Sequence, residues 1–136
     1  MSPEQRFPGK LDRRPQSRLS VAAHRAGDTG DVEVLALAGD IDMANGPQMR
    51  GEIRRCLEER PAVLVVDLSA VTFLNSTALT VLVEADRAAA AHIELRVVAS
   101  NRIVLRPIQI TALDQVLAVF PTLEDALAGT GRIGRL

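Results

Sequence analysis

Three small polar residues near the middle of the chain are the best candidates for chemistry. Asn75, Ser76 and Thr77 follow an apolar run and precede a segment with helical apolar spacing. Asparagine and serine are favoured at the start of a helix because a side-chain oxygen there accepts a backbone N–H. A cap, however, does not need three such residues in a row. The residue types therefore leave two interpretations open, a helix cap and an exposed recognition point.

A second candidate site is the pair of carboxylates that flanks Ile41. Asp40 and Asp42 lie at the end of an expected strand, where residues that contact ligands gather in α/β folds. Two carboxylates alone do not indicate a metal site, and a solvated loop accounts for them. A sensor of a nucleotide or another small ligand, built on this loop beside Asn75, is kept as a third hypothesis.

The other reactive side chains do not suggest a catalytic site. His24 and His92 have no cysteine, serine or carboxylate partner close by in the sequence, so structural roles are expected for both. Cys56 is the single cysteine, which excludes an intramolecular disulfide, and its place on an apolar helix face favours a buried side chain. No glycine-rich phosphate-binding loop is present. We therefore expect no enzyme activity, no cofactor and no metal.

Composition limits the class of protein. The 136 residues are 47% apolar, which suits one compact domain. The only aromatic residues are three Phe, and 16 basic residues nearly balance 17 acidic ones, so a nucleic-acid partner is not expected. The first 20 residues are polar and contain three prolines, unlike a signal peptide, and the most apolar stretch is broken by polar residues. We expect a cytoplasmic protein without a membrane partner.

Strand and helix patterns alternate after an initial hairpin. Strands are expected over residues 19–24, 32–38, 62–68, 94–99 and 116–120. Helices are expected over residues 45–60, 76–91, 101–110 and 122–127. Asn45 is a cap candidate for the first helix, and Phe73 and Leu74 are expected to anchor a loop before the second.

These elements predict an α/β fold, a small sandwich in which about four helices pack against a mixed β-sheet. The continuous apolar run over residues 62–68 indicates a strand buried on both faces. The folded domain is expected over residues 18–129. Residues 1–17 are expected to form a disordered basic arm, and residues 130–136 a flexible tail.

Three stretches resemble STAS domains, and specifically the bacterial anti-sigma-factor antagonists. Residues 67–79, DLSAVTFLNSTAL, are similar to the family signature D-L-S-x-V-x-F-x-D-S-S/T-G-L. Residues 37–42, LAGDID, look like its G-E-[IL]-D motif, and residues 105–113, LRPIQITAL, are similar to its L-x-x-x-x-x-T-G-L stretch. The resemblance extends over about residues 19–128, with the elements in the same order, and implies a STAS-type sandwich.

The resemblance also implies a mechanism. Such an antagonist binds an anti-sigma factor that is a serine kinase, and thereby releases a sigma factor for transcription. The kinase phosphorylates the antagonist, the complex dissolves, and a serine phosphatase resets it. The phosphoacceptor position falls on Ser76. Motif position and loop placement make six residues candidates for the partner interface: Asp40, Asp42, Met43, Asn75, Thr77 and Thr80. Both a monomer and a weak homodimer fit the sequence.

The chain departs from the signature at three positions. Asn75 stands where switchable members have Asp, and Ala78 and Ala112 replace glycines. These differences favour a second hypothesis, a STAS interaction or scaffold subunit that is never phosphorylated, such as a constitutive antagonist or a subunit of a transport complex. It predicts that Ser76→Ala and Ser76→Glu bind the same partner equally well.

Overall fold

A computed structural model describes residues 19–27 and 30–134, and the arm expected over residues 1–17 lies outside this range. The five strands of the single sheet are β2 (Ser20–Ala26), β3 (Val32–Ile41), β4 (Val63–Leu74), β5 (Glu94–Val98) and β6 (Ala118–Phe120). The helices are α1 (Gly46–Glu58), α2 (Ser76–Ala89), α3 (Arg102–Ile110), the short 3₁₀ helix η1 (Leu113–Gln115) and α4 (Leu123–Ala128).

The strands lie in the order β2-β3-β4-β5-β6, and only the first pair is antiparallel. The β2–β3 hairpin pairs Ser20 with Ala38 at one end and Ala26 with Val32 at the other. Each later strand is reached through a helical segment, because parallel neighbours require a crossover connection. The expected mixed sheet with an initial hairpin and four helices is confirmed.

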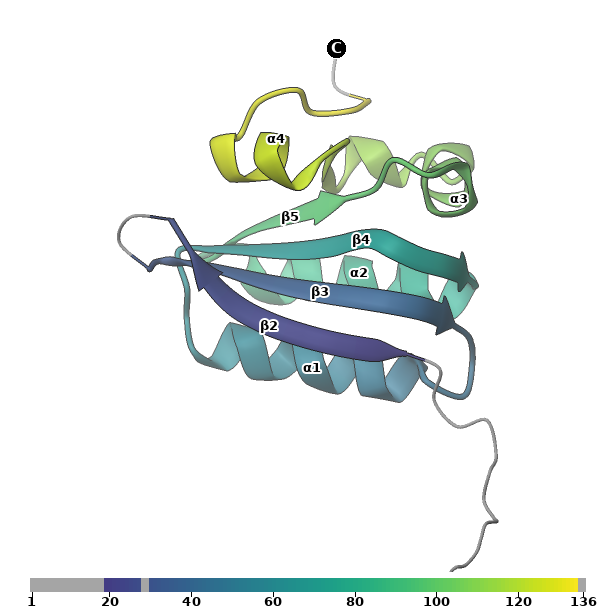
Figure 1. Ribbon diagram of the computed structural model, residues 1–136, viewed down its shortest axis with the longest axis horizontal. Coiled ribbons are helices and arrows are strands. Elements are labelled where there is room, and N and C mark those ends of the chain that lie inside the picture. Colours follow the sequence, from purple (N-terminus) through teal and green to yellow (C-terminus); the bar gives the residue numbers. More distant parts are fainter. Residues whose placement is uncertain (1–18, 28–29, 135–136) are drawn as a thin grey trace, which may run out of the picture.

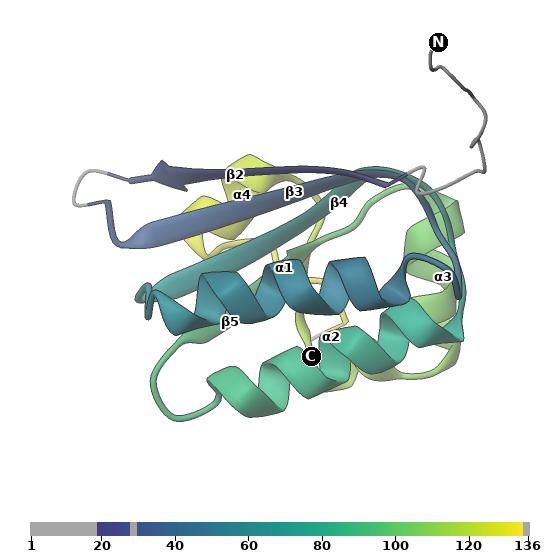
Figure 2. The ribbon, with the colours of Figure 1, turned by 90° about the horizontal axis from the view of Figure 1, so that it is seen from below.

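Helices cover both faces of the sheet. Helices α1 and α2 lie side by side on one face, and α4 lies on the other, next to β5 and β6 (Figures 1 and 2). Strand β4 shows why both faces need a cover. Leu64 and Val66 belong to the core under α1 and α2, Val65 belongs to the core on the α4 side, and all three are fully buried. The strand is therefore buried on both faces, as the continuous apolar run predicted.

The largest correction to the expected elements concerns the end of β4. The strand runs to Leu74, six residues beyond its predicted end, because β3 also extends to Ile41 and pairs with it, although the register shifts twice. Leu74 is buried as expected, whereas Phe73 is 49% exposed and does not anchor the segment inside. Neighbouring residues of a strand point to opposite faces, so the two side chains could not both be buried on one side.

Part of the expected tail contacts the sheet. Ile133 forms an antiparallel bridge to Val119, with its N–H donating to the Val119 carbonyl at 2.7 Å. The Arg132 guanidinium donates to the Leu117 carbonyl at 3.3 Å. Arg132 and Ile133 therefore occupy part of the outer edge of β6, which shields that strand edge.

Cys56 is buried in the core on the inner face of α1, with 2% of its surface exposed, as its apolar helix position predicted. Burial raises the pKa of its thiol from 9.0 to about 11, and the nearby carboxylate of Glu33 acts in the same direction. The folded state thus favours the neutral thiol, which is the less nucleophilic form.

The native Cys56 thiol is expected to react with a disulfide reagent at pH 8 far more slowly than the same thiol in urea. The time course of thiol absorbance with Ellman's reagent, native against unfolded, measures the difference. Because the folded pKa is raised, this group stabilises the fold below pH 9, and that contribution is lost as the pH rises through about 11. Equal native and unfolded rates would show that the thiol is accessible.

Candidate protein-interaction site

Three asparagines connect the carboxyl ends of the central strands to the starts of three helices. Asn45, Asn75 and Asn101 immediately precede α1, α2 and α3. Strands β3 and β4 end at the edge of the sheet where these helices begin (Figure 1). The carboxyl ends of parallel strands are where α/β proteins place their functional residues. This edge of the sheet, with Ser76 in it, is the candidate site.

Asn75 is the cap of α2. Its side-chain oxygen accepts the N–H of Thr77 at 3.0 Å, and its own N–H donates to the Ile41 carbonyl at 3.2 Å. The residue thereby ties the start of α2 to the end of β3. The helix start therefore does contain a cap, and the capping residue is Asn75 and not Ser76.

Ser76 is the first residue of α2 and is exposed. Its hydroxyl makes no hydrogen bond to any residue within 19–27 and 30–134, and its carbonyl accepts the Thr80 hydroxyl at 3.1 Å. The side chain is therefore free to meet another molecule. It also stands where the positive end of the helix dipole favours a negative group.

The end of β3 at Asp40 and the tight turn over residues 42–45 lie beside α2. The Asp40 carboxylate accepts the Thr72 hydroxyl at 2.6 Å, and the Asp42 carboxylate accepts the N–H groups of Ala44 and Asn45 at 3.0 and 3.2 Å. The Asp40 carboxylate thus links β3 to the neighbouring strand β4, and the Asp42 carboxylate holds the backbone of the turn that follows it. The described residues contain no cluster of three or more His, Cys, Asp or Glu side chains suited to a metal ion.

Asn45 does not cap its helix, contrary to expectation. Its side-chain oxygen accepts the Asp42 N–H at 2.8 Å, and its amide donates to the Asp40 carbonyl at 2.7 Å. Asn45 is 3% exposed, and its side chain satisfies two partly buried backbone groups, the Asp42 N–H and the Asp40 carbonyl. The side chain of Asn45 therefore makes its hydrogen bonds to the preceding loop, and none to the first turn of α1 as the sequence pattern predicted.

Replacing Asn45 with alanine is expected to cost about 1–3 kcal/mol of folding free energy, because two partly buried backbone groups lose their partner. Asn75→Ala, which removes one cap bond, should cost about 1 kcal/mol. Urea unfolding curves of both variants measure these values. A cost for Asn45→Ala no larger than that of a surface substitution would show that the loop does not depend on the side chain.

The loop and the start of α2 are in close contact at Gly46. A Cβ atom added at Gly46 would lie only 2.7 Å from Cγ2 of Thr77, so the two helix starts approach as closely as glycine allows. The six candidate interface residues lie on the elements that meet here, at the edge of the sheet where β3 and β4 end and α2 begins. Met43 and Thr80 are exposed there, and the other four are half-buried: Asp40, Asp42, Asn75 and Thr77.

Ser76 also borders a groove between α2 and α3 with a volume of about 460 Å³. The residues that line it are Leu74, Asn75, Ser76, Leu79, Arg102, Ile103, Arg106, Pro107, Ile110 and Thr111. The α3 members of this set were not among the predicted site residues. A signal was present in the sequence, because Ile103, Pro107 and Ile110 follow helical spacing in addition to the buried pair Val104 and Ile108.

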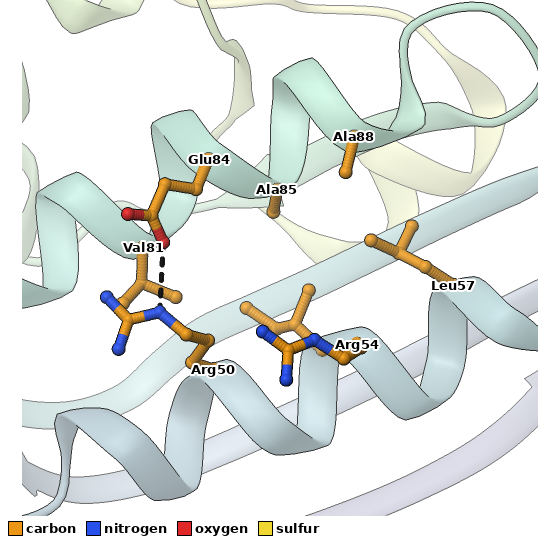
Figure 3. Close-up of a pocket in the computed structure, with 8 residues that line it drawn as sticks. Arg50, Arg54, Leu57, Val81, Glu84, Ala85 and Ala88 are labelled. Atoms are coloured by element: carbon orange, nitrogen blue, oxygen red, sulfur yellow. Dashed lines mark hydrogen bonds and ion pairs between the residues drawn. The ribbon is translucent and has the colours of Figure 1, made fainter.

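A second groove lies between α1 and α2, farther from the start of α2, and Ser76 does not line it (Figure 3). The Arg50 guanidinium and the Glu84 carboxylate form an ion pair across it at 2.9 Å, above the apolar side chains of Val81 and Ala85. Both charged side chains are substantially exposed, so the pair contributes little to stability. Arg54 also lines this groove without a hydrogen bond or ion pair to the described residues, but none of the candidate interface residues borders it.

Within residues 19–27 and 30–134, no helix combines the length and apolar character needed to span a bilayer.

The model of the STAS domain family matches residues 25–126, and the chain belongs to this family. A similar protein is the anti-sigma-F factor antagonist RsfB of Mycobacterium tuberculosis, which is 36% identical over 110 residues, covering 79% of this chain and 90% of RsfB.

Solved structures agree with the family. An anti-sigma factor antagonist from Mycobacterium paratuberculosis has a TM-score of 0.78 and 34% identity, over 85% of this chain and 96% of that one. The anti-sigma factor antagonist SpoIIAA in its unphosphorylated form has a TM-score of 0.62 and 18% identity, over 79% and 95% of the two chains. SpoIIAA in its phosphorylated form has a TM-score of 0.56 at 17% identity, over 79% and 98%. The SpoIIAA comparisons establish the STAS-type fold.

Proposed function

We propose that this protein is an anti-sigma-factor antagonist, which binds an anti-sigma factor through the sheet edge around Ser76 and so regulates sigma-factor-dependent transcription. The observation that carries the proposal is the free, exposed Ser76 hydroxyl at the start of α2, in a chain 36% identical to an anti-sigma-F factor antagonist. The loop of Asp40 and Asp42, with exposed Met43, extends the same surface.

The partner in this proposal is an anti-sigma factor of the serine-kinase type, and phosphorylation of Ser76 ends the complex. A phosphoserine carries about −1.5 to −2 charges near neutral pH. The dianion must lose its hydration to enter an interface, and where the partner offers no cation this costs several kcal/mol. A serine phosphatase would return the protein to its binding form.

The same charge is compatible with the fold of the antagonist. Ser76 begins a 14-residue helix, and the positive end of a helix dipole favours a nearby anion by about 0.3–1 kcal/mol. Asn75 already satisfies the Thr77 N–H, so a phosphate would not have to replace the cap. The modification therefore acts on the complex and leaves the domain folded.

The proposal is tested by capture from the native host with wild-type and Ser76→Ala baits, followed by incubation with ATP. We expect both baits to retain an anti-sigma factor with a serine-kinase domain, and the wild-type bait alone to gain one phosphate, mapped to Ser76 by mass spectrometry. Ser100→Ala, an exposed serine in another loop, is the matched control and should be phosphorylated like wild type. Retention of no anti-sigma factor would refute the proposal.

A second candidate function is a STAS interaction subunit that is never phosphorylated. It is favoured by Asn75, whose neutral side chain replaces the signature carboxylate beside Ser76 and is engaged in capping. If this function holds, a captured partner binds without transferring phosphate to Ser76.

A further inference from the structure

We propose that the groove between α2 and α3 receives an amphipathic helix with acidic flanks, supplied by the anti-sigma factor. The identity of the protein that supplies the helix rests on the proposed function. The form and charge of the helix follow from α3 itself.

Helix α3 has two apolar stripes, one buried in the core and one that borders the open groove beside α2. Val104 and Ile108 form the inner stripe and are fully buried. Ile103, Pro107 and Ile110 form the outer stripe along the groove, where Ile103 is 54% exposed and Ile110 is 69% exposed. A soluble domain needs only the inner stripe to hold a surface helix. The outer stripe is thus surplus to folding and available to a partner.

The spacing of the outer stripe indicates a helical partner. Successive members lie four and three residues apart, the repeat by which two helices pack along a common seam. A helix that docks in a groove presents apolar anchors at positions i, i+3 or i+4, and i+7. Nine residues of α3 extend about 13 Å, so the groove accommodates about two and a half turns of a docked helix.

The positive charge of the groove favours a docked helix with acidic residues on either side of its apolar seam. Arg102 and Arg106 lie one helical turn apart on the groove rim, and both are exposed. Neither guanidinium forms a hydrogen bond or an ion pair with the described residues, which is also true of Arg54, Arg60 and Arg87 elsewhere on the surface. Arg102 and Arg106 differ from these in bordering one apolar groove together. The groove lining contains no Asp or Glu. Two unpaired cations beside an apolar floor complement carboxylates that flank an apolar seam.

The position of Ser76 in the same groove explains how a phosphate would act. Ser76 lies on the α2 side of the groove, and the arginines lie on the α3 side. A phosphate at Ser76 adds negative charge where the acidic helix docks, and it competes for the same guanidinium groups. Phosphorylation then expels this helix by repulsion and by competition for one pair of arginines.

The test compares two charge-reversed proteins with equal net charge. Arg102→Glu/Arg106→Glu alters the α2–α3 groove. Arg54→Glu/Arg55→Glu alters two exposed arginines of α1, of which Arg54 borders the α1–α2 groove and Arg55 is paired with Glu52. Affinity for the anti-sigma factor retained by the Ser76→Ala bait is measured by calorimetry at low and high salt. We expect the groove variant to bind at least about tenfold more weakly, with a smaller salt dependence, and the α1 variant to stay within about twofold of wild type. Equal affinities of the two variants would overturn the proposal.

A photo-cross-linking amino acid at position 110 identifies the docked segment without assuming which protein supplies it. In the full-length protein, we expect the cross-linked peptide to carry apolar residues at helical spacing and more Asp and Glu than Lys and Arg. A second variant carries the same amino acid at position 43, in the loop after β3. A cross-linked segment with neutral or basic flanks would overturn the docking proposal, and so would cross-links from position 43 with none from position 110. If the segment is acidic but belongs to a protein other than an anti-sigma factor, the proposed function fails while the groove assignment stands.

Discussion

Ser76→Glu is expected to bind the anti-sigma factor more than a hundredfold more weakly than Ser76→Ala does. Ser76 is exposed at the start of α2 and lines the α2–α3 groove, so a carboxylate there enters the proposed interface. A desolvation penalty of about 3 kcal/mol is sufficient for this loss of affinity. The dissociation constants of both purified variants, measured by calorimetry against the same anti-sigma factor, give the ratio directly.

The control is Ala88→Glu, which places the same charge on an exposed position of the same helix. Position 88 lies twelve residues from Ser76, about 18 Å along the helix axis. It should leave the affinity within about twofold of wild type. Ser76→Glu itself should unfold at the same urea concentration as Ser76→Ala or slightly higher, because the charge suits the helix start. Equal binding of Ser76→Ala and Ser76→Glu would leave Ser76 without a switching role.

Leu82→Ala is expected to destabilise the domain by about 2–5 kcal/mol. Leu82 is fully buried between α2 and the sheet, and alanine leaves a cavity that a close-packed core cannot fill. Domains of this kind have about 5–15 kcal/mol of stability in total, so the loss is a large share of it. Because α2 carries Ser76 at its start, the interaction edge depends on this packing. Urea denaturation followed by circular dichroism measures the change.

Leu127→Ala is the matched control, since it removes the same atoms from a leucine of α4 that is 38% exposed. Its cost should be clearly smaller, because less apolar surface returns to water and water fills the vacated space. The slope of the unfolding free energy with urea should be unchanged in both variants. Similar costs for the two substitutions would mean that α2 is not held by its buried face.

Much of this protein follows from local patterns in its sequence. The run from Val63 to Leu68 indicated a strand buried on both faces, because no polar residue but Asp67 interrupts it. The order of strands and helices then required a mixed sheet with helical crossovers. The signature around Ser76 carried the family resemblance, whereas the residue types there left a helix cap and an exposed recognition point both open. The structure assigns the cap to Asn75.

Tertiary structure decided what depends on partners far away in the chain. Strands β3 and β4 extend beyond their apolar runs because each supplies the other's hydrogen bonds, and this pairing exposes Phe73. Asn45 serves the Asp40–Asp42 loop rather than α1, because the folded loop shields two backbone groups that need partners. Ser76 and Arg106 border one groove only after α3 packs against β4, near the start of α2. Local periodicity determines which side chains a helix buries, but only packing determines which neighbour its exposed side faces.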